Sequence, residues 1–159
     1  MTRTMWAGMT VLVLVMGGLQ TMAANDDGGA RGSRFHCSDM SLRGTYGIQI
    51  QGTRPVPPPL GGGFETIIGV VVRTYDGAGN FFQVDNTHGS VTGFVPDRPG
   101  QGTYQVNPDC SGATQFEPGP GITLQERLVI VDDGDEIRTI VSLPTSVMVS
   151  TVQKKMNTR

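Results

Sequence analysis

The chain has 159 residues, carries a net charge of −2, and is 37% hydrophobic and only 16% charged. One domain is expected at that length, and so few charges exclude a coiled coil and a charge-driven disordered chain. Because the charge is nearly balanced, the sequence offers no basic surface for nucleic acid. The two histidines, His36 and His88, are few for a histidine-based metal site, and we expect neither a metal nor another cofactor.

Residues 1–23 have the composition of a secretory signal peptide. Arg3 supplies a positive start, an uncharged apolar stretch follows at residues 6–19, and small residues precede a cleavage site after Ala23. The apolar stretch is short for a membrane span. We therefore expect cleavage and a secreted or periplasmic protein. Since no cysteine directly follows the apolar stretch, we expect no membrane anchor.

After the signal, we expect a flexible leader at residues 24–40, a β-barrel domain at 41–155 and a C-terminal tail at 156–159. From Ser41 onward, short runs of alternating apolar residues are separated by turn residues, which is typical of β-strands. The predicted strands are 44–51, 65–75, 81–85, 90–95, 103–107, 110–117, 122–131, 136–143 and 146–153. The intervening turns include 76–80, 86–89, 96–102 and 118–121.

The predicted fold is all-β. Strands joined by short turns favour antiparallel neighbours in an up-and-down meander. Closing this meander into a single barrel of 8–9 strands removes its exposed edges. An open β-sandwich is the main alternative.

Cys37 and Cys110 are the only cysteines, and both follow the signal. An exported protein meets an oxidising compartment, so the pair is predicted to form a disulfide. The bridge would tie the leader to the start of the strand at 110–117. Neither cysteine has the C-x-x-C spacing of a redox-active thiol.

Glu126 and Tyr46 are the candidate ligand-binding residues. If Leu124 and Leu128 face the core, the two-residue period of a strand directs Glu126 inward with them. A buried carboxylate requires a partner, a water-filled cavity or a ligand. Alternation with polar neighbours places Tyr46 on the same inner face. No catalytic set is visible, and the acidic run at 132–136 lacks the spacing of a calcium loop.

The sequence leaves two states of the interior open. In a hollow barrel, Glu126 should lie beside a pocket of roughly 300 Å³ or more. In a filled barrel, Glu126 should lie at a rim, exposed or paired with Arg73 or Arg138, and loops such as residues 54–64 would carry the function. We expect the filled or nearly filled barrel, because a small domain has few side chains to spare for walls around an empty space.

The most distinctive motifs are Cys37, L-R-G-T-Y-G at 42–47, D-G-x-G-N-F at 76–81 and G-T-Y-x-V-N-x-D-C-S-G at 102–112. Together they resemble a group of small exported bacterial proteins of unknown function, over most of the chain after the signal. The resemblance implies a barrel similar to the lipocalins, or calycins. Lipocalins carry G-x-W on the first strand, where this chain has Gly44-Thr45-Tyr46. Their long first loop corresponds to the proline-rich segment at 52–63.

Three functions compete. The sequence favours an exported barrel that acts through its surface or loops on an unknown protein partner. The alternative is a lipocalin-like carrier of a small apolar ligand. An enzyme is the least favoured, because no catalytic set is visible and fold alone does not decide function.

Overall fold

The computed structural model describes residues 36–119 and 121–157. The predicted signal peptide at residues 1–23 and the leader up to residue 35 lie outside the described residues. So do residue 120, in the predicted break at 118–121, and the last two residues of the tail.

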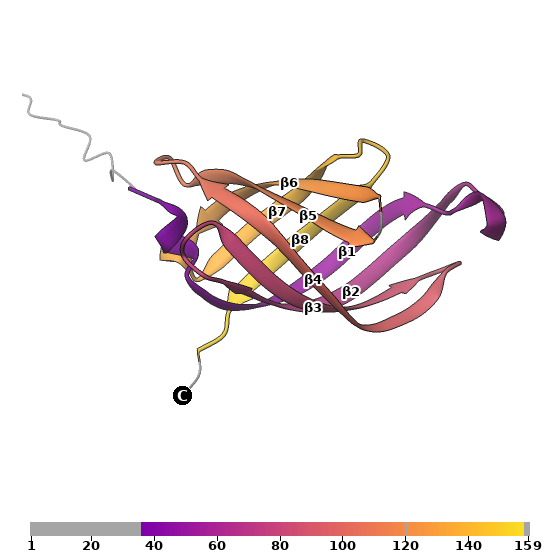
Figure 1. Cartoon of the computed structure of the whole chain (residues 1–159), viewed down its shortest axis with the longest axis horizontal. Coiled ribbons are helices and arrows are strands. Elements are labelled where there is room, and N and C mark those ends of the chain that lie inside the picture. The colour runs from indigo at the N-terminus through magenta and orange to yellow at the C-terminus, as the bar shows by residue number, and fades with distance from the viewer. Residues whose placement is uncertain (1–35, 120, 158–159) are drawn as a thin grey trace, which may run out of the picture. The chain divides into compact units, whose positions relative to one another are not determined.

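Eight antiparallel strands form one closed up-and-down barrel, as the sequence predicts (Figure 1). Each strand pairs with the next one along the chain, and β1 closes the barrel against β8, from Tyr46 opposite Lys155 to Thr53 opposite Met148. The closure excludes the β-sandwich. The strands are β1 (Gly44–Pro55), β2 (Phe64–Tyr75), β3 (Asn80–Gly89), β4 (Gly93–Val106), β5 (Ser111–Gly119), β6 (Ile122–Val131), β7 (Glu136–Leu143) and β8 (Met148–Lys155). Three 3-10 helices are η1 (Asp39–Leu42), η2 (Pro58–Leu60) and η3 (Asp132–Gly134).

Inward and outward positions alternate along the strands, and the sequence pattern of β6 follows this rule. Glu126, Leu128 and Ile130 are buried, whereas Arg127 and Val129 between them are exposed. The inward direction expected for Glu126 is therefore confirmed. Strand β2 is apolar on both faces, so its inner set, which includes Val71 and Arg73, could not be chosen from hydrophobicity alone.

The predicted turn at 96–102 is wrong, because residues 93–106 form the single strand β4. β5 pairs with β4 only from Gly102 to Val106, so Pro96 and Pro99 lie where no β5 partner needs their missing N–H groups. In the pairing of β3 with β4, the register shifts between Asp85 and Thr87. This bulge accommodates the residues of β4 between Val95 and Arg98. The predicted turn at 86–89 is likewise wrong, because β3 continues to Gly89.

The predicted hairpin turn after β2 is confirmed. The Asp76 carboxylate accepts hydrogen bonds from the backbone N–H groups of Ala78 and Asn80 at 2.7 and 3.0 Å. Gly77 and Gly79 have φ angles of 82° and 95°, which side chains rarely adopt. The D-G-x-G-N pattern is therefore explained by the turn itself.

One end of the barrel is filled by a packed core. Tyr75 lies at its centre, with ring-centroid distances of 5.5 Å to Tyr46, 5.0 Å to Tyr104 and 5.7 Å to Phe81. Leu42 of η1 is fully buried against this cluster. Edge-to-face contacts of this kind add to the stability that burial alone supplies.

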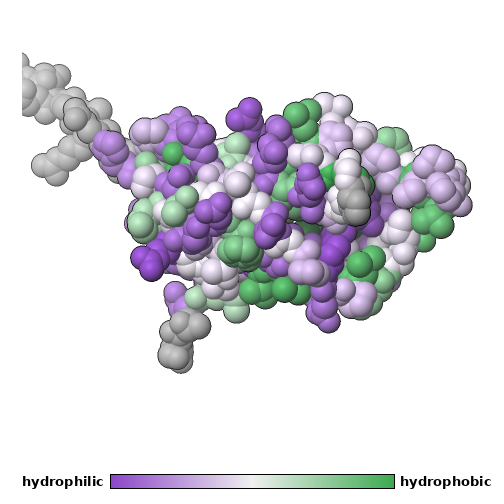
Figure 2. All heavy atoms as spheres, viewed as in Figure 1, coloured by the Kyte–Doolittle hydropathy of each residue, from purple (hydrophilic) through white to green (hydrophobic). Residues whose placement is uncertain are grey.

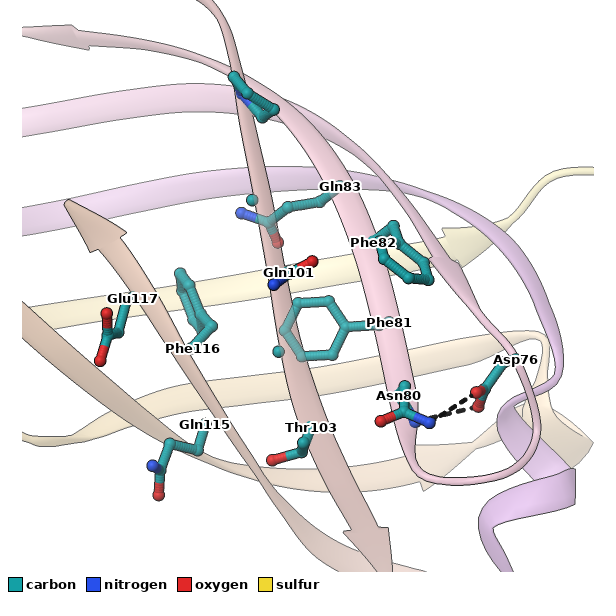
Figure 3. Close-up of a pocket in the computed structure, with 13 residues that line it drawn as sticks. Asp76, Asn80, Phe81, Phe82, Gln83, Gln101, Thr103, Gln115, Phe116 and Glu117 are labelled. Carbon is teal, nitrogen blue, oxygen red and sulfur yellow. Dashed lines mark hydrogen bonds between the residues drawn. The ribbon is translucent and has the colours of Figure 1, made fainter. Parts of the chain in front are cut away.

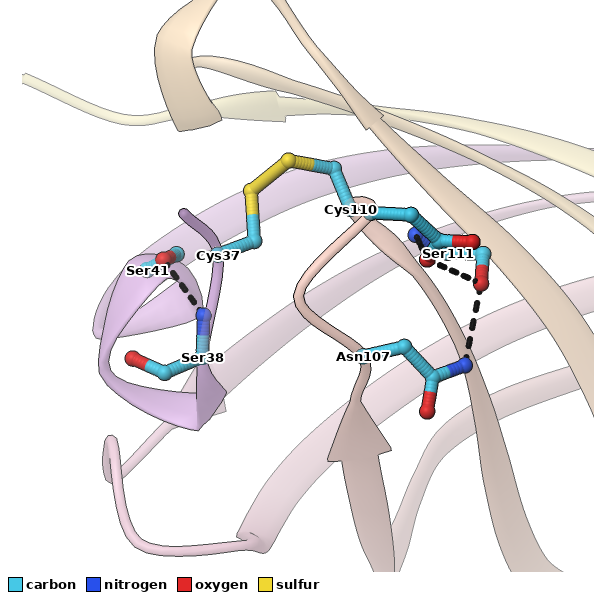
Figure 4. Close-up of a disulfide and its surroundings, with 7 residues drawn as sticks. Cys37, Ser38, Ser41, Asn107, Cys110 and Ser111 are labelled. Carbon is cyan, nitrogen blue, oxygen red and sulfur yellow. Dashed lines mark hydrogen bonds between the residues drawn. A yellow bond between two sulfur atoms is a disulfide. The ribbon is translucent and has the colours of Figure 1, made fainter. Parts of the chain in front are cut away.

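A disulfide between Cys37 and Cys110 fastens η1 over this closed end (Figure 4). The bridge confirms the predicted pair and spans 73 residues of sequence. The Asp39 carboxylate accepts a hydrogen bond from the Val106 backbone N–H at 2.7 Å. The bridge, this hydrogen bond and the burial of Leu42 thus attach residues 36–42 to the closed end of the barrel. We call this segment, which includes the described end of the expected leader, the lid.

Candidate functional site: a cavity in the open half of the barrel

The opposite half of the barrel encloses a cavity of about 430 Å³. Aliphatic side chains from several strands line it, among them Ile48, Ile67 and Leu124. Its walls also include three prolines: Pro55, the last residue of β1, Pro118 near the end of β5, and Pro144 directly after β7. Because proline fixes its own φ angle, the backbone at these three positions has little freedom even without a ligand.

An ion pair crosses the bottom of this cavity. Arg73 of β2 donates a hydrogen bond from Nη1 to Oε2 of Glu126 on β6 at 3.2 Å, and both side chains are almost fully buried. Thr114 donates a second hydrogen bond to the same oxygen at 2.7 Å. The Arg73 guanidinium lies 4.2 Å from the ring centre of Phe81, which belongs to the packed core. The pair therefore separates the cavity from the closed end.

Neighbouring groups keep Arg73 charged. Burial lowers the pKa of Arg73, but the Tyr75 hydroxyl and the Glu126 carboxylate outweigh burial and hold the pKa above its usual range. The Tyr75 hydroxyl accepts a hydrogen bond from Arg73 at 3.2 Å and donates one to Gln153 at 2.9 Å. Hydrogen bonds thus link the Arg73–Glu126 pair to Tyr75 of the packed core and, through Tyr75, to Gln153 of β8.

A second ion pair lies on the wall of the cavity, between β3 and β4. Arg98 contacts both carboxylate oxygens of Asp85, from Nε at 3.0 Å and from Nη2 at 3.2 Å. Gln83 joins the two pairs: its carbonyl accepts from Arg73 at 2.8 Å, and its amide donates to Asp85 at 3.2 Å. Two-point contact fixes the Arg98 guanidinium in one orientation.

A third pair holds a turn at the open end. Arg54 of β1 donates to Glu65 of β2 at 2.8 Å, and Glu65 also accepts from the backbone N–H groups of Val91 and Thr92 in the β3–β4 turn. Burial raises the pKa of Glu65, but these backbone donors and the Arg54 guanidinium outweigh it and lower the pKa from 4.5 to about 2.

Thr87 has a buried hydroxyl that stands out from the other polar side chains of the described residues. Within residues 36–119 and 121–157, its Oγ1 is the one buried side-chain polar atom that makes no hydrogen bond. Thr87 is 2% exposed and lines the cavity. An unsatisfied buried hydroxyl costs about 1–3 kcal/mol.

The two sequence-predicted ligand residues have different environments. Glu126 lines the cavity. Tyr46 lies in the packed core of the closed end, where its hydroxyl donates to the Gly134 carbonyl at 2.6 Å, and it is not among the residues that line the cavity. The expectation of a filled or nearly filled barrel is met in the closed half only, because the cavity exceeds the roughly 300 Å³ scale of small-molecule sites.

Sequence reasoning missed Thr87 and Arg98 as cavity residues. Both belong to segments interpreted as turns, since Asn86 to Gly89 and Pro96 to Gly102 are rich in turn-forming residues. The pairing of Gly69 with Thr87 and of Asp85 with Arg98 extends the strands through both segments. A parity count from Phe81 through Asp85 would have placed Thr87 inward, had the strand been extended.

A larger, open hollow of about 870 Å³ lies over β3, β4 and β5 (Figure 3). Its lining includes Gln101 and Thr103 of β4, Gln115 and Glu117 of β5, and the phenyl ring of Phe82. It has neither the enclosure of the interior cavity nor an ion pair among its lining residues. We therefore take the interior cavity as the candidate site.

The outer surface carries an apolar strip on β2 and β3 (Figure 2). Ile68, Val70 and Val72 of β2 and Phe82 and Val84 of β3 are each between 44% and 62% exposed. Over the described residues, no helix has both the length and the apolar character to cross a membrane.

Comparisons with protein-family models, with curated proteins and with solved structures find no match to this chain. The resemblance to small exported bacterial proteins therefore stays a prediction.

Proposed function

We propose that the protein binds a small, mainly apolar organic molecule inside the open half of the barrel. The observation that carries the proposal is the cavity of about 430 Å³, closed below by a packed core and bounded by aliphatic walls. Small-molecule sites are typically apolar pockets of about 300–1,000 Å³ with a few placed polar groups. Eight-stranded barrels can hold one small ligand, which agrees with the lipocalin-like carrier that the sequence offers as its alternative.

The experiment measures binding of the uncharged fluorescent probe N-phenyl-1-naphthylamine. Val149→Trp places a large ring in the cavity from β8, whereas Val152→Trp places the same ring on the outer face of the same strand. We expect saturable probe binding that Val149→Trp abolishes and Val152→Trp retains. Equal binding by both variants would assign the probe to the surface and would reject the cavity, and so would absence of binding by the unsubstituted protein.

We also propose that the protein is exported. The order of positive residue, apolar stretch and small residues before Ala23 supports export, and the Cys37–Cys110 disulfide is compatible with an oxidising compartment. N-terminal sequencing of the protein recovered from an exporting bacterial host should give a start near Ala24. An intact Met1 on soluble cytoplasmic protein would contradict export.

Surface-mediated interaction is the second candidate function, and the apolar strip on β2 and β3 favours it. Contiguous exposed apolar residues often mark an interface, and a second copy of the chain is the simplest occupant to test. Sedimentation velocity over a range of concentrations should then show dimers that Val70→Ser/Val72→Ser removes. A monomer at all concentrations would leave the cavity as the supported site.

A further inference from the structure

We infer that the ligand of the cavity is uncharged and carries one hydrogen-bonding group that meets the hydroxyl of Thr87. The inference rests on the proposed function and narrows it to a chemical class: neutral amphipathic molecules with a hydroxyl, carbonyl or amide group. Two independent observations support the inference. The charged side chains at the cavity are paired, and the buried hydroxyl of Thr87 has no hydrogen-bond partner within the part of the chain that the structure describes.

The charges at the cavity cancel in pairs. Five charged side chains line it: Arg54, Arg73, Arg98, Asp85 and Glu126. Arg73 pairs with Glu126, Arg98 pairs with Asp85, and Arg54 pairs with Glu65, which is not itself among the lining residues. A ligand with a net charge would bury that charge without a counterion, or would have to displace a carboxylate from its arginine. An uncharged ligand disturbs none of these pairs.

The two carboxylates that line the cavity also accept hydrogen bonds from neighbouring protein groups. Glu126 accepts from Arg73 and Thr114, while Asp85 accepts from Arg98 and Gln83. Thr87 is different, because its buried Oγ1 has no partner among the described residues. A hydroxyl both donates and accepts, so it suits an alcohol, a ketone or an amide equally.

Thr87 belongs to the wall of the cavity, and rotation about its Cα–Cβ bond would bring the buried hydroxyl to a ligand. It follows Asp85 by two residues on the inner face of β3, about 7 Å further along the strand. Aliphatic residues of other strands, including Ile67, Val141 and Val149, line the same cavity. Besides the paired charges and the hydrogen-bonded Gln83 and Thr151, a ligand therefore meets Thr87 and mainly apolar walls. At the packing density of an organic liquid, the cavity of about 430 Å³ has room for roughly 17 non-hydrogen atoms, which is enough for N-phenyl-1-naphthylamine.

The test uses four compounds that share one phenylbutyl body: butylbenzene, 4-phenylbutan-1-ol, 4-phenylbutanoate and 4-phenylbutylammonium. Each compound competes with N-phenyl-1-naphthylamine for binding to the folded protein, at a pH where the acid and the amine are both ionised. We expect the alcohol to bind several-fold more tightly than butylbenzene. We expect both ions to bind at least about tenfold more weakly than the alcohol.

Thr87→Val removes the hydroxyl while keeping the shape of the side chain. It should abolish the preference for the alcohol over butylbenzene, measured as the ratio of the two affinities. Thr66→Val, on the outer face of β2, is the matched control and should leave this ratio unchanged. An ion that binds as tightly as the alcohol, or a preference that survives Thr87→Val, would overturn the inference while leaving the cavity proposal intact. Loss of all probe binding in the unsubstituted protein would overturn both.

Discussion

Arg73 and Glu126 face each other across the lumen, 3.2 Å apart, from strands that lie four positions apart in either direction around the closed barrel. A pair between opposite walls divides the interior into two compartments. On one side of the pair lies the aromatic core, which the disulfide-bonded lid covers at the closed end. On the other side lies the cavity. The same pair therefore belongs both to the stability of the fold and to the base of the candidate site.

The first prediction concerns this pair. Glu126→Leu leaves Arg73 charged and buried, so we expect it to lower the free energy of unfolding by about 3–5 kcal/mol. Arg73→Met/Glu126→Leu removes both charges and should be more stable than Glu126→Leu alone. Urea unfolding of the single and double variants measures this. Arg138→Met removes a pair whose arginine is exposed and should cost less than Glu126→Leu.

A double variant no more stable than Glu126→Leu would contradict this account. In that case the hydrogen bonds that Thr114 and Gln83 make to the pair, rather than the charges, would carry the stability.

The inward direction of Glu126 was predictable, whereas its partner was not. The alternation of Leu124, Glu126 and Leu128 defines one face of one strand, which is local information. The contact with Arg73 depends on how far the strands shift relative to one another when the barrel closes, and no local pattern encodes that shift. The sequence therefore named Arg73 only as one of two possible partners.

The state of the interior was the largest failure of the sequence reasoning. Hydrophobic parity identifies which residues face inward, but not how much volume they leave. Large rings at Tyr46, Tyr75 and Phe81 fill one half, while Ile50, Leu124 and Val149 line the other around open space. Pro96 and Pro99 were interpreted as a turn because proline is rare in paired strands, and only the tertiary pairing shows that this part of β4 lacks a β5 partner.

The second prediction concerns acid. The folded pKa of Glu65, about 2, lies below its ordinary value of 4.5. The carboxylate therefore stabilises the fold fully above pH 4.5, and this contribution is lost as the pH falls from 4.5 towards 2. Glu65→Gln should be less stable than the unsubstituted protein at neutral pH and should approach it near pH 2.

Thermal unfolding monitored by circular dichroism across this pH range measures the difference. Glu117→Gln, which removes a carboxylate from the exposed outer face of β5, is the control and should run parallel to the unsubstituted protein. Because Glu65 holds the β3–β4 turn, we expect probe binding to weaken over the same acid range. A pH dependence that is identical with and without Glu65 would be inconsistent with its lowered pKa.

The third prediction concerns alkali. The chain has three tyrosines, Tyr46, Tyr75 and Tyr104, and burial raises the pKa of each; that of Tyr46 rises from 10.0 to about 12. An unfolded tyrosine loses its proton at lower pH than these do, so the fold loses stability as the pH rises from 10 towards 12. We expect tyrosinate absorbance to appear cooperatively with unfolding, well above pH 10. A gradual titration centred on pH 10, with circular dichroism unchanged, would show that the rings are accessible.

The fourth prediction concerns the disulfide. Cys37→Ser/Cys110→Ser opens a loop of 73 residues, and the chain-entropy model assigns such a cross-link about 4 kcal/mol. We expect a loss of that order in the free energy of unfolding, measured by urea denaturation of the variant beside the oxidised protein. The bridge lies at the closed end, with the Arg73–Glu126 pair between it and the cavity. Consequently, the folded fraction of the variant should keep its affinity for the probe. A variant that retains full stability would show that Leu42 and Asp39 hold the lid without the bridge, and a variant that is stable but binds weakly would show that the two compartments are coupled.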